Sequence, residues 1–140
     1  MERRPVPADA THGATDDVVT KLSPWSAADT VARLSAVIAA RGMKLFAVID
    51  HSGEATASGL DLRDTKVVFF GSPETDVHVI AGEPLAALDL PLKVAVWVDG
   101  HQTKISYVAP AVLTARHYLS RELAEALASI GPLTDKVIDR

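Results

Sequence analysis

The chain has 140 residues, and a domain of this length removes roughly 68–70% of its unfolded surface from water. It contains no cysteine, which excludes disulfides, thiolate metal sites and thiol catalysis. Its net charge is −4 and Lys and Arg form no cluster, so we expect no nucleic-acid partner.

Residues 1–16 are rich in Pro, Ala, Thr, Gly and Asp without periodicity, which predicts a flexible tail. Residues 17–140 then form a single globular domain. The tail has no apolar core of a signal peptide, and no stretch of about 18 apolar residues occurs in the chain. We therefore expect a cytoplasmic protein without membrane contact.

Residues 17–23 alternate between apolar and polar side chains, as a short strand does. Ser26 is a helix cap, and the apolar stripe that follows it ends at Gly42, so a helix is expected between them. Residues 44–49 are apolar on both sides, which is typical of a buried strand.

The segment between this strand and the next, at 66–70, holds a short predicted helix capped by Ser52. The connection is about 15 residues long, which is enough for a right-handed crossover between parallel strands. Ser72 and Pro73 then begin another helix, which runs to about residue 81.

Residues 92–98 and 101–107 form a predicted β-hairpin around an Asp99–Gly100 loop, with Val98 opposite His101. A helix follows from Pro110, and a further one ends at Gly131–Pro132. Together these elements predict an α+β fold. We expect a two-layer sandwich with a single mixed sheet of about five strands and helices mainly on one face.

If strands 44–49 and 66–70 are parallel, Asp50 and His51 lie beside Gly71 and Ser72, where two helices begin. Helix N-termini at the carboxyl ends of strands favour polar or anionic ligands. Tyr107 and His117 could reach this edge from the C-terminal half. The alternative is structural: Asp50 accepts hydrogen bonds from a local turn, while His51 caps or packs.

Two classes of function stay open. A binding module, which we prefer, would hold a small polar or anionic ligand or a partner protein at this edge. An enzyme would use His51 as a general base oriented by Asp50, with His117 as the acid. The chain lacks the motifs of common hydrolases, kinases and dehydrogenases, and its histidines are scattered. We therefore predict no metal site and name no cofactor.

Several segments resemble the bacterial and archaeal family known as domain of unknown function 302, over about residues 17–131. They include Asp50–His51, residues 70–73, Trp97, Asp99–Gly100, residues 107–110 and His117, and the most specific is the Leu-Asp-Leu-Pro-Leu-Lys run at 88–93. The resemblance implies a compact α/β domain, commonly dimeric, without a settled activity. It thus suggests a homodimer, and Trp97 on the second face of the hairpin is a candidate contact.

The chain also departs from the family pattern at two places. Ser72 stands where the family usually has Asn, and acidic residues follow Pro73 in place of a Lys-x-Gly segment. A basic ligand contact there, if the family makes one, would be lost or reversed. Ala109 replaces an Asp or Asn and is expected to be a poor helix cap.

Overall fold

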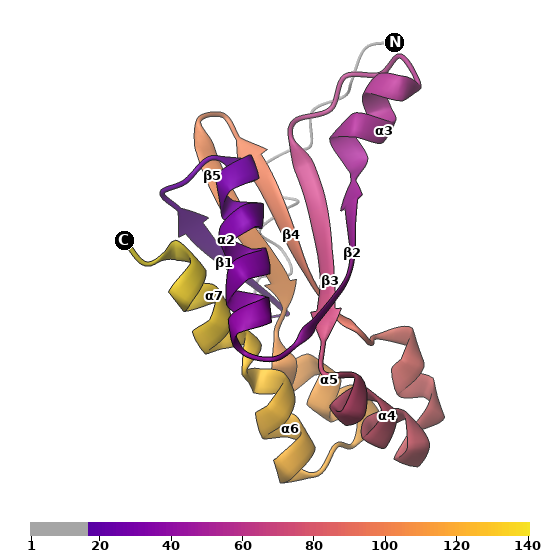
Figure 1. Ribbon diagram of the computed structural model, residues 1–140. Coiled ribbons are helices and arrows are strands. Elements are labelled where there is room, and N and C mark those ends of the chain that lie inside the picture. The colour runs from indigo at the N-terminus through magenta and orange to yellow at the C-terminus, as the bar shows by residue number, and fades with distance from the viewer. Residues whose placement is uncertain (1–16) are drawn as a thin grey trace.

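The computed structural model describes residues 17–140, so the predicted tail at 1–16 lies outside the described residues. Figure 1 shows one sheet with helices on one face and around one end. The strands are β1 (Val18–Ser23), β2 (Lys44–Asp50), β3 (Thr65–Gly71), β4 (Leu92–Asp99) and β5 (Gln102–Val108). The helices are α2 (Ala27–Ala40), α3 (His51–Ala57), α4 (Pro73–Gly82), α5 (Pro110–His117), α6 (Arg121–Ala128) and α7 (Ile130–Ile138), with a 3₁₀ turn η1 (Pro84–Leu88).

The strand order is β1-β5-β4-β3-β2, and every neighbouring pair is antiparallel. The α+β two-layer fold predicted from the sequence is confirmed. The prediction of a mixed sheet is wrong, because no described strand pair is parallel.

The error arose at the connection between β2 and β3. Lys44 lies opposite Gly71 and Asp50 opposite Lys66, so the chain reverses between these strands. A crossover helix must lay an apolar stripe on the sheet, but no residue of α3 is buried. Figure 1 shows α3 beyond the end of β2, so it belongs to a long hairpin connection.

The ends of α2 follow the local sequence as predicted. The Ser26 side chain accepts a hydrogen bond from the Asp29 N–H. At the other end, Gly42 has a φ of +72°, and the Met43 N–H donates to the Ile38 carbonyl. This left-handed residue suits glycine, which has no Cβ to clash.

The β4–β5 hairpin has the predicted strands but a different loop. Asp99 pairs with Gln102, so the loop residues are Gly100 and His101 rather than Asp99 and Gly100. Of the two loop residues, Gly100 alone has a positive φ, the pattern of a type II′ turn. The predicted register is shifted by two residues, and each side chain keeps its predicted face because strands repeat every two residues.

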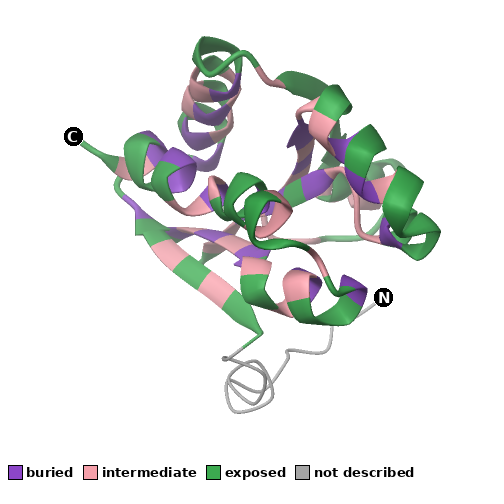
Figure 2. Cartoon of the chain, turned by 90° about the horizontal axis from the view of Figure 1, so that it is seen from below, coloured by how far each residue is buried: buried purple, intermediate pink, exposed green. Residues whose placement is uncertain are grey.

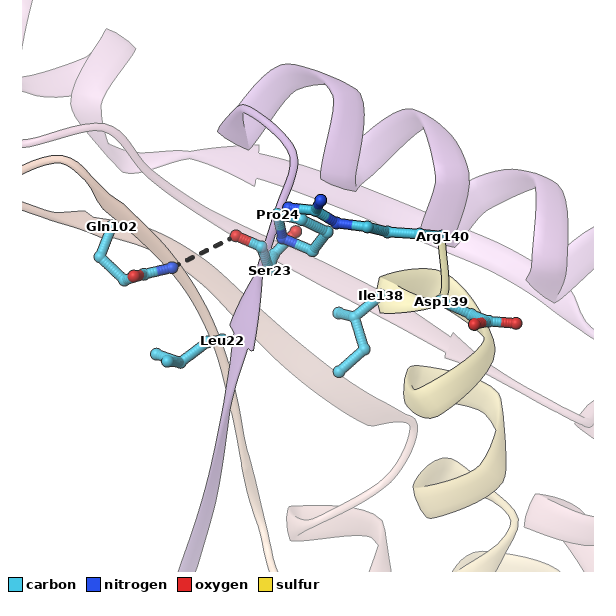
Figure 3. A pocket seen from close by; sticks show the side chains of 7 residues that line it. All are labelled: Leu22, Ser23, Pro24, Gln102, Ile138, Asp139 and Arg140. Carbon is cyan, nitrogen blue, oxygen red and sulfur yellow. Dashed lines mark hydrogen bonds between the residues drawn. The ribbon is translucent and has the colours of Figure 1, made fainter.

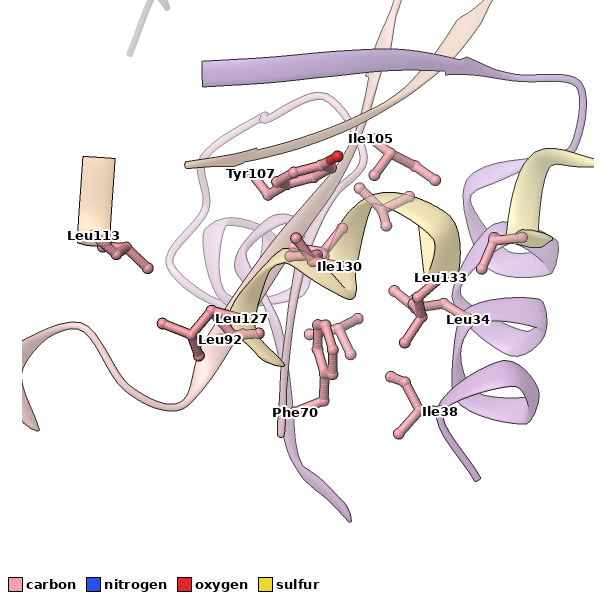
Figure 4. Close-up of a cluster of buried hydrophobic side chains, with 14 of the residues drawn as sticks. Leu34, Ile38, Phe70, Leu92, Ile105, Tyr107, Leu113, Leu127, Ile130 and Leu133 are labelled. Carbon is pink, nitrogen blue, oxygen red and sulfur yellow. The ribbon is translucent and has the colours of Figure 1, made fainter. Parts of the chain in front are cut away.

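The core lies between one face of the sheet and the helices α2 and α7 (Figure 4). Leu34 and Ile38 of α2 meet Phe70 and Leu133 there, and all four are fully buried. Figure 2 shows buried residues concentrated where helices meet the sheet. Residues 131–132 do not end a helix as predicted, because they lie in the first turn of α7.

The edge strand β2 contradicts the prediction of a buried strand, because all of its residues are exposed. Leu45, Phe46, Val48 and Ile49 each leave 40–42% of their surface accessible. A β-bulge between Leu45 and Ala47 breaks the expected alternation. Leu45 and Val48 therefore share the helix-facing side of the sheet, opposite Phe70 and Val68, while Ala47 and Ile49 lie on the open face.

The packing predicts unequal costs for two Leu→Ala substitutions. Leu34 is completely buried, so Leu34→Ala should lower the free energy of unfolding by about 2–5 kcal/mol. Leu22 is 57% exposed, and Leu22→Ala should change it by less than about 1 kcal/mol. Urea denaturation followed by circular dichroism measures both, and equal losses would contradict this description of the core.

Candidate functional site

The antiparallel sheet separates the residues that were predicted to share one pocket. Asp50 and His51 lie at the end of β2, beside the start of β3, whereas Gly71 and Ser72 lie at the opposite end of β3. The premise of a single pocket holding all four is therefore wrong. Helices α4 and α5 gather at the Gly71 end, and α3 stands alone at the other (Figure 1).

Asp50 is the N-cap of α3, a role that sequence analysis assigned to Ser52. Its carboxylate accepts hydrogen bonds from the Ser52 hydroxyl at 2.6 Å and the Gly53 N–H at 2.9 Å. These bonds, first the one from Ser52, lower the pKa of Asp50. Asp50 therefore makes local hydrogen bonds at a turn, as the structural alternative expected.

The same serine joins α3 to β3. The Ser52 hydroxyl lies 3.2 Å from the Thr65 N–H and 3.2 Å from Asp64 Oδ1. Lys66 forms ion pairs with Asp64 and, at 3.9 Å, with Asp50. Asp64 and Lys66 belong to no recognisable motif, so the sequence alone did not predict this network. His51 is exposed at the first position of α3, and the Asp50 carboxylate that was to orient it is engaged in capping.

At the other end of β3, Ser72 caps α4 as predicted, with its hydroxyl accepting a bond from the Thr75 N–H. Gly71 permits a close approach of the Asp76 side chain, since a Cβ there would lie 2.8 Å from Asp76 Oδ2 and the carboxylate would have to shift. Asp76 is 8% exposed, and burial raises the pKa of its carboxyl group. Asp76 was not among the residues predicted for the site, and its acidic side chain in the fourth position of α4 was the available signal.

His117 has a partner that sequence analysis did not identify. Its Nε2 lies 2.5 Å from Asp89 Oδ2, and Arg116 donates to both oxygens of the same carboxylate at 2.9 and 3.0 Å. Burial opposes the charge of Asp89, but the bonds from His117 and Arg116 outweigh it and lower the pKa. This cluster ties the last turn of α5 to the segment between η1 and β4, and His117 is 7% exposed.

Tyr107 occupies a separate environment. It is buried in the core, and Lys21 Nζ lies 5.4 Å from its ring centre. The Lys21 ammonium also donates to the Gly131 carbonyl at 2.9 Å and pairs with Asp135 at 2.8 Å. Burial opposes the charge of Lys21, but the bonds with Asp135 and Tyr107 outweigh it and raise the pKa. Tyr107 thus helps to fasten β1 to α7.

A hollow of about 500 Å³ lies between the end of β1 and the C-terminus (Figure 3). No residue predicted for the site lines it. Its lining residues are Leu22, Ser23, Pro24, Gln102, Ile138, Asp139 and Arg140.

Within residues 17–140, no group of three or more His, Cys, Asp or Glu side chains is arranged to hold a metal ion. No helix there is long and apolar enough to cross a membrane.

The fold defines the class of this chain: an antiparallel five-stranded sheet with helices on one face. The crystal structure of an uncharacterized conserved protein DUF302 from Bacillus stearothermophilus is similar, with a TM-score of 0.73 and 20% identity over 87% of this chain and 95% of that one. The family model described as Domain of unknown function DUF302 matches residues 19–137. The chain belongs to this family, as its sequence segments suggested.

Two Brucella proteins that are similar to this chain are longer than it. The chain is 33% identical over 103 residues to "Fluoride-specific ion channel FluC 1" of Brucella suis biovar 1, covering 73% of this chain and 41% of that protein. A protein of the same name from Brucella abortus biovar 1 is also 33% identical over 103 residues, which are 73% of this chain and 38% of that protein. The chain therefore matches less than half the length of these relatives.

The Asp89 cluster predicts a pH-dependent contribution to stability. A carboxyl group whose pKa falls on folding stabilises the fold at pH values above its ordinary pKa of 3.8. This contribution is lost as the pH falls through the lowered pKa. At neutral pH, Asp89→Asn should lower the free energy of unfolding by about 1–2 kcal/mol. The difference between variant and wild type should shrink below about pH 4.

Denaturation curves at several pH values measure this difference. The matched control is Asp99→Asn, which weakens the exposed pair with Lys104 and should cost less. A difference for Asp89→Asn that stays constant from neutral to acid pH would show that the carboxylate charge is not its source.

Proposed function

We propose that this chain is a protein-binding module that works as a homodimer, with the edge strand β2 as its contact element. The observation that carries the proposal is the exposure of β2, where residues 45–49 are all apolar and all exposed. A contiguous apolar edge offers both side chains and unpaired backbone groups to another protein.

Edge strands normally carry features that prevent pairing with other chains, such as proline, charged side chains and bulges. β2 has a bulge and a charged residue at each end, Lys44 and Asp50, but its interior has neither charge nor proline. The other edge strand, β1, carries Lys21 within its length and alternates exposed with more buried residues. β2 is therefore the better edge for strand addition.

Binding is favoured over catalysis by the roles of the candidate residues. Asp50 is engaged in capping α3, and His117 is held by Asp89 within a buried cluster. These contacts account for two of the three side chains on which the enzyme hypothesis depends. The antiparallel pairing of β2 with β3 separates Asp50 and His51 from Gly71 and Ser72, which argues against a small polar ligand held jointly by all four within one chain.

Trp97, the earlier candidate for the dimer contact, already has partners within its own chain. Its indole N–H donates to the Ser106 hydroxyl at 2.9 Å. The Lys104 and Arg63 cations lie 5.1 and 5.9 Å from the ring centre. These contacts explain a half-buried tryptophan without a second chain.

Charge placed within β2 should prevent association. We expect Phe46→Lys to weaken self-association by more than tenfold, because an ammonium group would have to lose water at the contact. Leu22→Lys, on the opposite edge, and Trp97→Ala should leave association unchanged. Sedimentation velocity across a concentration series measures all three. A wild-type chain that stays monomeric at high micromolar concentration, or a loss with Trp97→Ala alone, would contradict the proposal.

A second candidate, action together with a fluoride channel, is favoured by the similarity to the two Brucella proteins. Under this proposal the chain supports the passage of fluoride through a separate channel. A strain lacking the chain should then grow more slowly in medium containing fluoride, and wild-type chain should restore growth. Equal growth of the two strains at every fluoride concentration would rule this candidate out.

A further inference from the structure

We infer that the occupant of the β2 edge is β2 of a second copy, paired antiparallel about a two-fold axis near Ala47. This inference rests on the proposed function and specifies its interface. The arrangement would join two sheets into one continuous sheet, with β2 strands at its centre.

The first argument is the sequence of β2, Lys-Leu-Phe-Ala-Val-Ile-Asp. It carries a positive charge at one end, a negative charge at the other and five apolar residues between them. In an antiparallel pair, the Lys44 end of each copy lies against the Asp50 end of the other, so opposite charges meet twice. A parallel pair would instead bring like charges together at both ends.

The second argument is that β2 is apolar on both of its faces. Leu45 and Val48 lie on the helix-facing side, and Ala47 and Ile49 on the open face. A second strand of the same composition would supply apolar neighbours on both sides of the sheet. A partner with one apolar face would cover only half of these side chains.

Antiparallel pairing also has a consequence for the predicted site. Within one chain, Asp50 and Gly71 are separated along the strands by about 20 Å, since six residue steps rise about 3.4 Å each. In the pair, Asp50 of one copy lies beside Lys44 of the second copy, which is opposite Gly71 there. The distance across two strand spacings is about 10 Å. The Asp50–His51 segment of each copy thus approaches the Gly71–Ser72 segment of the other.

Single cysteines test the geometry cleanly, because the chain has none of its own. Ala47→Cys places two thiols near the two-fold axis, so mild oxidation should give a covalent dimer. Lys44→Cys places them about 20 Å apart in an antiparallel pair, beyond disulfide range, and should not cross-link. Leu22→Cys on β1 is the control. Cross-linking through Lys44→Cys or Leu22→Cys, but not through Ala47→Cys, would overturn the inference.

Charge reversal provides an independent test that does not need a disulfide. Lys44→Asp and Asp50→Lys should each weaken self-association about tenfold, because like charges then meet at both ends. A mixture of the two variants should associate as tightly as wild type, because opposite charges meet again. Circular dichroism of each variant checks that it is folded, since Asp50 also caps α3. Failure of the mixture to recover would overturn the inference.

The two proposals fail in different ways. Self-association that Phe46→Lys abolishes, but that cross-links through Lys44→Cys rather than Ala47→Cys, would retain the proposed homodimer through β2 and overturn the antiparallel pairing about Ala47. Self-association that neither Phe46→Lys nor the charge variants affect would overturn both.

Discussion

The antiparallel pairing of β2 with β3 is the constraint on which the rest of the molecule depends. It places β2 at the edge of the sheet, with Lys44 opposite Gly71 and Asp50 opposite Lys66. The polar residues that follow β2 and those that follow β3 therefore lie at opposite ends of the sheet. One end is held together by Asp50, Ser52, Asp64 and Lys66, and the other carries the Asp89–His117 cluster.

Local sequence rules predicted those parts of the fold that local forces determine. Ser26 and Gly42 delimit α2, Ser72 and Pro73 begin α4, and Ala109 caps α5 poorly, without a side-chain hydrogen bond, all as expected. Strand direction is different, because it depends on where a connecting helix packs. The length of the connection permitted a crossover, but α3 contains no residue that becomes buried. The absence of an apolar stripe in residues 51–57 was the signal that length alone could not supply.

The candidate site shows the same division between local and long-range information. Capping at Asp50 and Ser72 involves neighbouring residues, and the sequence indicated polar contacts at both. The pair of His117 with Asp89 joins residues 28 apart, and that of Lys21 with Thr134 joins residues 113 apart. Such pairs follow from the packing of whole elements, so no spacing in the sequence reveals them. His117 could therefore be recognised as a candidate without its pairing with Asp89 being visible.

The apolar composition of β2 does not suit its exposed position at the edge of the sheet in a single chain. Five successive apolar residues are typical of a strand with neighbours on both sides and cover on both faces, which is why the sequence predicted burial. The fold of one chain places this strand outermost, with all of its residues exposed. Exposed apolar surface of this kind has a free-energy cost in water that a solitary chain cannot avoid. Pairing with a second β2 would give the strand a neighbour on each side, so its composition would suit its place in a dimer.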